Sequence, residues 1–347
     1  MDLTGSPRAT VAELFAGTGA GRFGRAQRRP RGTRLPVSIV TGFLGAGKTT
    51  LIRALLDSPE GANTAIVVNE FGEVGIDNAL LRASSDATVL LGNGCVCCLA
   101  RSDLQESLRT LFADRARGAV PSFERVVIET SGLADPGPLL QTFASDRALG
   151  EEFHLQALVT VIDAPNGARN LASAPEAREQ VALADRIVLT KSALADPGEL
   201  IALVRTLTAA PVERAENGVI DPAFLLDERL DLPVRIPEHD HAHAHSHGIE
   251  SFALTFGKPL DWPAFEQAMA VLTTLRGPDL LRVKGIVAVE GVRGPVVVHA
   301  VQHTAHQPIE LQTWPDADRT SRLVFITRGI GRVEVENLLA AVAALST

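Results

Sequence analysis

Apolar stretches alternate with mixed apolar and polar stretches over the first two thirds of the chain. The apolar runs predict short buried strands at 37–40, 65–69, 88–91, 125–129, 157–163 and 186–190. Most gaps between them have the mixed pattern of a helix, as at 48–57 and 102–113. Strands that are apolar throughout and alternate with helices are typical of a mostly parallel sheet covered by helices on both faces. This part of the chain is therefore predicted to be an α/β domain.

A second region follows a change in composition. Residues 233–248 are rich in Pro, Asp and His, and we expect a linker there. Beyond it the pattern predicts a smaller α+β domain, with strands at 251–256, 281–289, 295–301 and 322–327 and helices at 262–275 and 333–345. The expected organisation is an arm at 1–34, an α/β domain at 35–232, the linker, and a C-terminal domain at 249–347.

Composition and charge narrow the class of protein. The chain has 347 residues and a formal net charge of −8. An acidic balance argues against a general nucleic-acid-binding protein. No apolar run approaches the ~20 residues of a membrane-spanning helix, so we expect a cytoplasmic protein that does not insert in a membrane. The arginine-rich residues 1–34 are predicted to be a disordered arm, with a transit peptide as the alternative.

A phosphate-binding loop is the strongest motif. Residues 42–49 read Gly-Phe-Leu-Gly-Ala-Gly-Lys-Thr and fit the pattern G-x-x-x-x-G-K-S/T between a predicted strand and a predicted helix. Glycines let the backbone N–H groups surround an anion, and the helix adds its positive end. We expect Lys48 to reach the β- and γ-phosphates and Thr49 to hold Mg²⁺. The candidate nucleotide-binding residues here are Gly42, Gly45, Ala46, Gly47, Lys48, Thr49 and Thr50.

A carboxylate follows another predicted strand. Glu129 ends the apolar run 126–128, and Gly132 comes three residues later. In phosphate-loop proteins a carboxylate at such a place can organise Mg²⁺ or water, and a glycine N–H can sense the γ-phosphate. Glu129 therefore joins Lys48 and Thr49 as a candidate catalytic residue. The alternative is a solvated glutamate at the end of a strand.

The motif that would recognise the nucleotide base is incomplete. GTPases commonly recognise guanine with N-K-x-D after a late strand, and here Thr190 and Lys191 lead to Ala193. The stem of Lys191 fits over a base, but a methyl group cannot accept from guanine N1–H and its 2-amino group. Asp196 would substitute only if the loop is rearranged. The sequence thus supports nucleotide binding through Thr190 and Lys191 and leaves the preference between GTP and ATP open.

Three thiols form a candidate metal site. Cys95, Cys97 and Cys98 are the only cysteines, which excludes a disulfide framework. Thiolates favour Zn²⁺, with Co²⁺ as a second candidate, and three protein ligands leave a fourth position open for metal transfer. Buried apolar cysteines and a redox pair of Cys95 with Cys98 are the alternatives.

Histidines form a second candidate site for metal. They alternate with small or acidic residues in the predicted linker, where a mobile chain would let imidazoles collect metal ions. The candidates are His239, His241, His243, His245 and His247. A polar linker with no metal role is the alternative. His299, His303 and His306 fit surface or partner-facing positions better than ligand positions.

Taken together, these motifs resemble the CobW family of phosphate-loop GTPases and metallochaperones. The similar segments are 42–50, 69–72, 95–98 and 129–132, with 281–285 and 322–326 in the second domain. The resemblance implies a G domain with a phosphate-loop NTPase fold and a CobW-like C-terminal domain. It also implies that GTP and Mg²⁺ control the loading and release of metal on the three thiols. Glu70 is then a candidate ligand of Mg²⁺ or of the transferred metal, or a plain loop carboxylate.

The predicted function is a nucleotide-hydrolysing metallochaperone that releases a divalent metal, with Zn²⁺ favoured, to a client protein. Whether it forms a homodimer is open. Three alternatives remain: a phosphate-loop kinase or transferase with a structural metal, cobalt delivery in cobalamin biosynthesis, and a non-enzymatic metal store.

Overall fold

The structure divides the chain into two compact units. The computed structural model describes residues 34–69, 89–92, 101–227, 248–305, 308–315 and 317–345. The described residues up to 227 form one unit, and those from 248 onward form the other. Several predicted features lie outside the described residues: the arm up to residue 33, Glu70, the three cysteines, the five linker histidines and His306.

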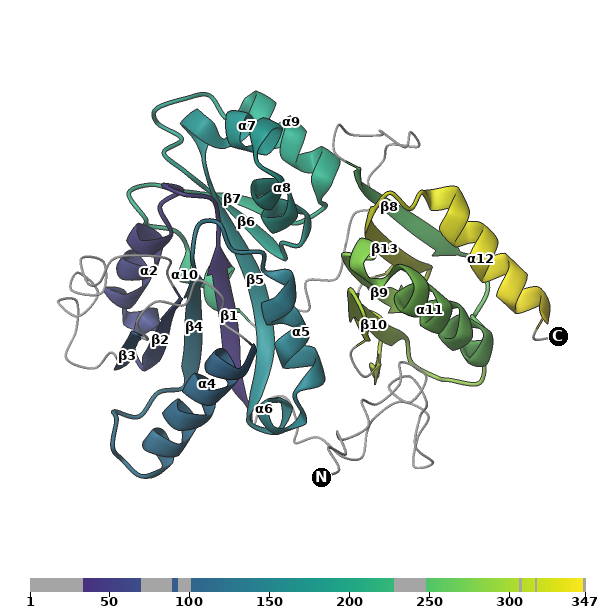
Figure 1. Cartoon of the computed structure of the whole chain (residues 1–347), viewed down its shortest axis with the longest axis horizontal. Coiled ribbons are helices and arrows are strands. Elements are labelled where there is room, and N and C mark those ends of the chain that lie inside the picture. The colour runs from purple at the N-terminus through teal and green to yellow at the C-terminus, as the bar shows by residue number, and fades with distance from the viewer. Residues whose placement is uncertain are drawn as a thin grey trace, which may run out of the picture. The chain divides into compact units, whose positions relative to one another are not determined.

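The first unit is built on a parallel sheet of seven strands in the order β3-β2-β4-β1-β5-β6-β7 (Figure 1). The strands are β1 (Leu35–Thr41), β2 (Thr64–Asn69), β3 (Val89–Gly92), β4 (Arg125–Thr130), β5 (Phe153–Asp163), β6 (Arg186–Thr190) and β7 (Val212–Ala215). Every pair of neighbours is parallel. All seven carboxyl ends therefore lie along one edge, where the loops of doubly wound folds bind ligands.

Helices cover both faces of this sheet. They are α2 (Lys48–Leu56), α4 (Arg101–Ala116), α5 (Gly137–Ser145), α6 (Arg147–Glu152), α7 (Ala164–Ser173), α8 (Pro175–Ala182), α9 (Gly198–Leu207) and α10 (Pro222–Leu226). Strand β6 shows the two faces: Val188 packs in the cluster of α2 and α10, whereas Ile187 and Leu189 pack in the cluster of α7, α8 and α9. Successive strand residues point to opposite faces, so a strand buried on both sides is apolar throughout.

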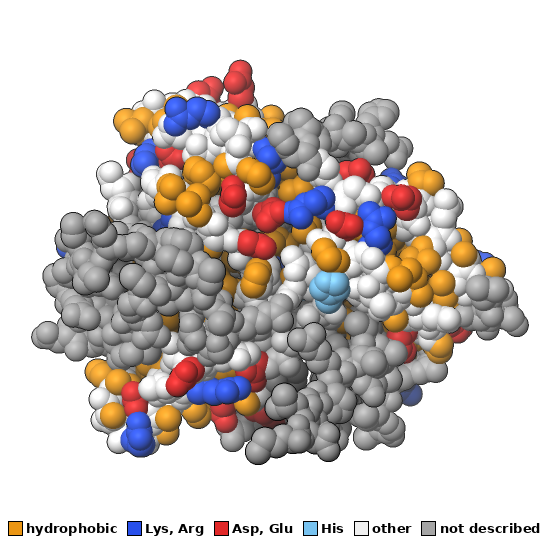
Figure 2. Space-filling view, viewed as in Figure 1, with side chains coloured by type: hydrophobic (Ala, Val, Ile, Leu, Met, Phe, Trp, Pro, Cys, Tyr) orange, Lys and Arg blue, Asp and Glu red, His pale blue; other side chains and the backbone are white. Residues whose placement is uncertain are grey.

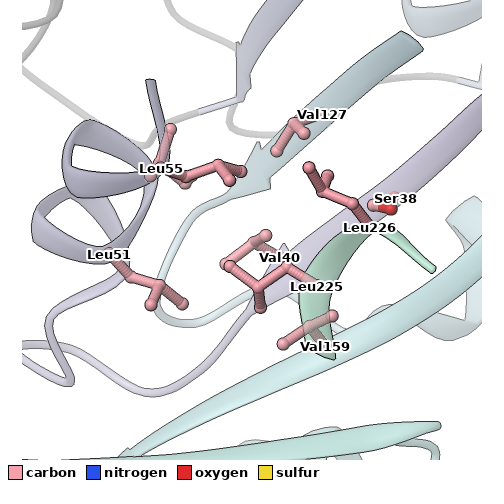
Figure 3. Close-up of a pocket in the computed structure, with 9 residues that line it drawn as sticks. Ser38, Val40, Leu51, Leu55, Val127, Val159, Leu225 and Leu226 are labelled. Carbon is pink, nitrogen blue, oxygen red and sulfur yellow. The ribbon is translucent and has the colours of Figure 1, made fainter. Parts of the chain in front are cut away.

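Helix α2 carries the end of the predicted phosphate loop, and its apolar face is well anchored. Leu51 and Leu55 face Val40, Val127 and Val159 of the sheet, with Leu225 and Leu226 of α10 closing the layer (Figure 3). Leu51 is fully buried. The start of α2 is therefore fixed against the sheet by packing rather than by a side-chain cap, because Gly47 precedes it and makes no cap hydrogen bond.

The second unit is an antiparallel sheet in the order β11-β10-β9-β13-β8, with β12 also paired to β10. Its elements are β8 (Ile249–Phe256), α11 (Trp262–Arg276), β9 (Arg282–Val287), β10 (Val296–Val301), β11 (Thr304–Ala305), β12 (Ile309–Glu310), β13 (Ser321–Arg328) and α12 (Arg332–Leu345). Trp262, Phe265 and Met269 of α11 form the core with Val283, Val298 and Phe325 of the sheet. Asp261 caps α11 by accepting from the Ala264 N–H at 2.8 Å.

The predicted fold class is confirmed: a mostly parallel sheet with helices on both faces, and a smaller α+β unit. Strands β7, β11 and β12 were not predicted. Strand β7 contains two charged residues and is only partly buried, and the other two strands have two residues each.

The surface and the helices agree with the composition. On the face drawn in Figure 2, acidic and basic side chains of the described residues are interspersed. Among the described residues, none of the helices combines the length and apolar character needed to cross a membrane.

Candidate functional site

The phosphate loop leaves the end of β1 with a backbone that requires glycine. Gly42 has φ 146°, and a Cβ there would lie 2.2 Å from the Val161 carbonyl oxygen of β5. Gly47, with φ 96°, adopts the left-handed conformation directly before α2. Residues other than glycine rarely adopt either backbone conformation. The loop is therefore pressed against the neighbouring strand, with the first turn of α2 and its unpaired N–H groups at its end.

Lys48 lies across this loop. Its side chain is buried, and Nζ donates to the carbonyl oxygens of Gly42 at 2.9 Å and Phe43 at 3.4 Å. The ammonium group is thus held inside the loop at the start of α2. A cation beside backbone N–H groups is a site suited to a phosphate.

Thr49 and Glu129 meet at the edge of the loop. Thr49 Oγ1 donates to Glu129 Oε1 at 2.6 Å, although the two residues are 80 positions apart. Strands β1 and β4 are neighbours, with Val40 opposite Glu129, and this register brings the pair together. Glu129 is 6% exposed. A hydroxyl and a carboxylate oxygen in contact are hard oxygen ligands of the kind that Mg²⁺ prefers, so the pair fits this ion.

The turn after β4 contacts the phosphate loop directly. A Cβ on Gly132 would lie 2.7 Å from Leu44 N and 2.8 Å from Leu44 Cα. Only glycine lets the two backbones approach this closely. The turn closes with the Ala134 N–H donating to Ser131 O at 3.2 Å. Gly132 therefore lies beside the loop, as its predicted role requires.

The end of β6 supports the loop from the other side. Thr190 Oγ1 donates to Ala46 O at 2.7 Å, and Lys191 Nζ donates to Gly45 O at 2.8 Å. Lys191 Nζ also lies 3.6 Å from Asp163 Oδ2. Asp163 is 2% exposed and accepts from Asn166 Nδ2 at 2.6 Å. The two predicted base-site residues are thus joined to the phosphate loop.

Beyond Lys191 the structure contains no rearranged loop that would bring Asp196 to the position of Ala193. The turn 191–194 closes with the Leu194 N–H donating to Lys191 O at 3.0 Å, and Ala193 is exposed. Asp196 Oδ1 accepts from the Gly198 N–H, also at 3.0 Å, at the start of α9. The turn 191–194 itself contains no carboxylate, and Asp196 lies beyond it.

The histidines of the second unit differ in their surroundings. His303 Nδ1 lies 3.0 Å from the Thr273 carbonyl oxygen, at the end of α11. His299 lies on β10 opposite Lys284 of β9. Over the described residues, no group of three His, Cys, Asp or Glu side chains is arranged to hold a metal.

Two residues near the site were missed by the sequence reasoning. Asp163 ends an apolar strand as Glu129 does, and that shared pattern was a usable signal. Gln180 of α8 donates to two carbonyl oxygens of the turn after β4. A glutamine in an amphipathic helix gives no comparable signal, because its contact depends on the packing of α8 against the sheet.

Comparison with known proteins agrees with this geometry. Residues 36–216 match "CobW/HypB/UreG, nucleotide-binding domain", and residues 249–343 match "Cobalamin synthesis protein cobW C-terminal domain". The zinc chaperone YjiA of Escherichia coli is 33% identical over 320 residues, covering 90% of this chain and 98% of that protein. The zinc chaperone CobW of Pseudomonas aeruginosa is 32% identical over 350 residues, covering 88% and 91%.

A solved structure supports the same relationship over both units. The crystal structure of Zn(II)-bound YjiA GTPase from E. coli has a TM-score of 0.70 and 28% identity. It covers 89% of this chain and 99% of that one. Since the matched regions include the phosphate loop, Glu129 and the second unit, the chain belongs to the CobW/HypB/UreG family and carries the CobW C-terminal domain.

Proposed function

We propose that this protein is a nucleoside-triphosphate hydrolase that binds a divalent metal, with Zn²⁺ favoured, and delivers it to a client metalloprotein. The observation that carries the proposal is the Thr49–Glu129 contact at the mouth of a phosphate loop. The relatives that match nearly the whole chain are zinc chaperones, and one is a GTPase with bound zinc.

The phosphate site has a clear division of roles. Lys48 neutralises the β- and γ-phosphates, and the N–H groups of residues 45–50 surround them. Thr49 and Glu129 would hold Mg²⁺, which supplies charge neutralisation when bound. Glu129 keeps the Thr49 hydroxyl oriented, and Gly132 brings a backbone N–H beside the loop. Thr190 and Lys191 hold the loop carbonyls and so keep the cradle in shape.

Two strands that end at this edge of the sheet come shortly before the proposed metal ligands in the sequence. Glu70 directly follows the last residue of β2, and Cys95 comes three residues after the end of β3. The register aligns Val68 with Glu129 on one side and with Gly92 on the other. Neighbouring strands lie ~4.8 Å apart, so the end of β3 is about 10 Å from the end of β4. This proximity supports coupling between the nucleotide and the thiols Cys95, Cys97 and Cys98.

The roles of the linker histidines and of the C-terminal unit are proposed from their chemistry. The linker histidines 239–247 would collect metal at low affinity and pass it to the thiols. The C-terminal unit is available for recognition of the client. A client metalloprotein is the partner that such chemistry requires, because a thiol site with an open position releases its ion to a better ligand set.

Phosphate release by the purified full-length protein, with Mg²⁺ and with and without Zn²⁺, tests the proposal. Lys48→Ala should abolish release. Lys258→Ala removes an exposed lysine of the other unit and should leave release unchanged, which makes it the matched control. If wild-type protein releases no phosphate from GTP or ATP, or if Lys48→Ala retains wild-type release, the proposed function is wrong.

A further inference from the structure

The side chain of Gln180 joins helix α8 to the turn beside the phosphate loop. Gln180 is 1% exposed, and its amide nitrogen Nε2 donates to Gly132 O at 3.2 Å and to Ala134 O at 3.0 Å. These carbonyls belong to the turn that places Gly132 against Leu44. One side chain thus binds two carbonyl oxygens of the turn, and it lines the same cavity as Phe43 and Ala46 of the phosphate loop.

The glutamine is itself anchored to the sheet. Thr160 Oγ1 donates to the Gln180 carbonyl oxygen at 2.6 Å. Thr160 lies on β5 opposite Thr41, the last residue of β1 before the phosphate loop. The backbone of Gln180 is therefore tied to β5, the neighbour of the strand from which the loop leaves. Movement of α8 relative to β5 would displace the turn.

Two sets of contacts hold the turn. Its Gly132 backbone meets Leu44, where a Cβ would come within 2.8 Å of the loop backbone. The two hydrogen bonds from Gln180 hold the carbonyl oxygens of Gly132 and Ala134. Together these contacts set the distance between the Gly132 N–H and the loop. A terminal phosphate in the loop would meet that N–H only within a narrow range of positions.

The chemistry of the residue argues against a purely structural role. Two carbonyl acceptors require the NH₂ end of the amide to face the turn, so the orientation of Oε1 is also fixed. Oε1 is buried and accepts no hydrogen bond from the described residues. A buried polar atom without a partner destabilises a fold, and the two hydrogen bonds from Nε2 offset this cost; an apolar side chain would leave both turn carbonyls without this donor. The two donors are what glutamine contributes here.

We infer that Gln180 is a positioning residue for nucleotide hydrolysis. It holds the 131–134 turn at the distance from the phosphate loop at which the backbone of the turn contacts the terminal phosphate. The inference rests on the proposed function, because it requires a triphosphate in the loop. If Gln180 holds the turn in this way, the turn responds to a bound triphosphate and not to a bound diphosphate. That response then depends on a side chain outside the phosphate-loop motifs.

Three variants of the full-length protein test the inference. Gln180→Met keeps the length of the side chain and removes both donors. Thr160→Val removes only the anchoring bond and should act in the same direction more weakly. Gln156→Met is the matched control, because the Gln156 amide also donates to a backbone carbonyl, that of Leu226.

The readouts separate positioning from stability. In Gln180→Met we expect the affinity for a non-hydrolysable GTP analogue and kcat to fall about tenfold or more, the factor for one hydrogen bond. Affinity for GDP should stay within about threefold, as follows if the turn meets only the third phosphate. Amide hydrogen exchange at 131–135 should speed up without nucleotide. Gln156→Met should change none of these.

Four results would overturn the inference. If Gln180→Met lowers the affinities for GDP and the analogue equally, or lowers only the melting temperature, the role of Gln180 is structural. Unchanged exchange at 131–135 would show that the amide does not hold the turn. If wild-type protein releases no phosphate, the proposed function fails and the inference falls with it. If the wild type hydrolyses nucleotide and Gln180→Met is unaffected, the inference is wrong but the proposed function stands.

Discussion

Substitution of Ala193 by aspartate should strengthen the discrimination of guanine from adenine at the predicted base site. Ala193 is exposed in the turn 191–194, directly after Lys191, whose stem is proposed to lie over the base. A carboxylate at this position accepts from guanine N1–H and the 2-amino group. Adenine presents neither donor there. Since the residue is exposed, we expect the free energy of unfolding to change by less than about 0.5 kcal/mol.

The size of the effect follows from the bonds gained. A hydrogen bond to a charged group contributes roughly 1.5–3 kcal/mol, and each 1.4 kcal/mol is about a tenfold change in affinity. Ala193→Asp should therefore raise the ratio of GTP to ATP affinity by about tenfold or more. In the wild type, GTP and ATP should differ by less than about tenfold, because the methyl group of Ala193 accepts no hydrogen bond from guanine.

Competition against a fluorescent GTP analogue measures these ratios. GTP, ATP and ITP are the competitors, and ITP should fall between the other two in Ala193→Asp because inosine lacks the 2-amino group. Asp196→Ala is the control and should leave the wild-type ratio unchanged. A wild type that prefers GTP by more than about a hundredfold, and loses that preference in Asp196→Ala, would refute the reasoning and assign base reading to Asp196.

Three further changes have defined outcomes. Glu129→Gln removes the charge beside Thr49 Oγ1 and should lower Mg²⁺-dependent phosphate release at least about tenfold in a Mg²⁺ titration; unchanged release would exclude Glu129 from the Mg²⁺ site. Gly42→Ala places a Cβ 2.2 Å from Val161 O and should lower the free energy of unfolding in urea by about 1–3 kcal/mol, whereas a change below about 0.5 kcal/mol would contradict the close approach. Burial, and then the nearby Glu334, raise the pKa of Glu250. The folded state therefore holds this proton more tightly than the unfolded state, and the second unit loses stability as pH rises from about 4.3 through the raised pKa. Glu250→Gln should flatten that pH dependence and raise the melting temperature at pH 7; an unchanged melting curve would contradict it.

Local sequence patterns predicted the strands, the loop and the helix that build the site. The apolar run before Gly42 and the phosphate-loop motif were sufficient to place β1, the loop and α2, because packing and backbone conformation there agree with the sequence pattern. Glu129 was recognised because it ends an apolar strand. Six strands of the first unit were predicted because each is a run of mostly apolar residues. Strand β7 was missed because its residues 213 and 214 are charged.

Contacts between distant elements were not predictable from local patterns. Gln180 reaches the turn after β4 from 46 and 48 positions away. Its role depends on α8 packing against β5 and β6. Asp163 pairs with Lys191 through the register of β5 and β6, with Asp163 opposite Thr190. One sequence cannot show which polar residues of separate elements meet, because strand order and helix placement decide it.

We propose that the bound nucleotide controls the affinity for metal at Cys95, Cys97 and Cys98. Titration of the reduced full-length protein with Zn²⁺, in the presence of Mg²⁺ and either a non-hydrolysable GTP analogue or GDP, measures this control. We expect tighter Zn²⁺ binding with the triphosphate analogue and weaker binding with GDP. Equal Zn²⁺ affinities in the two states would show that nucleotide and metal are not coupled.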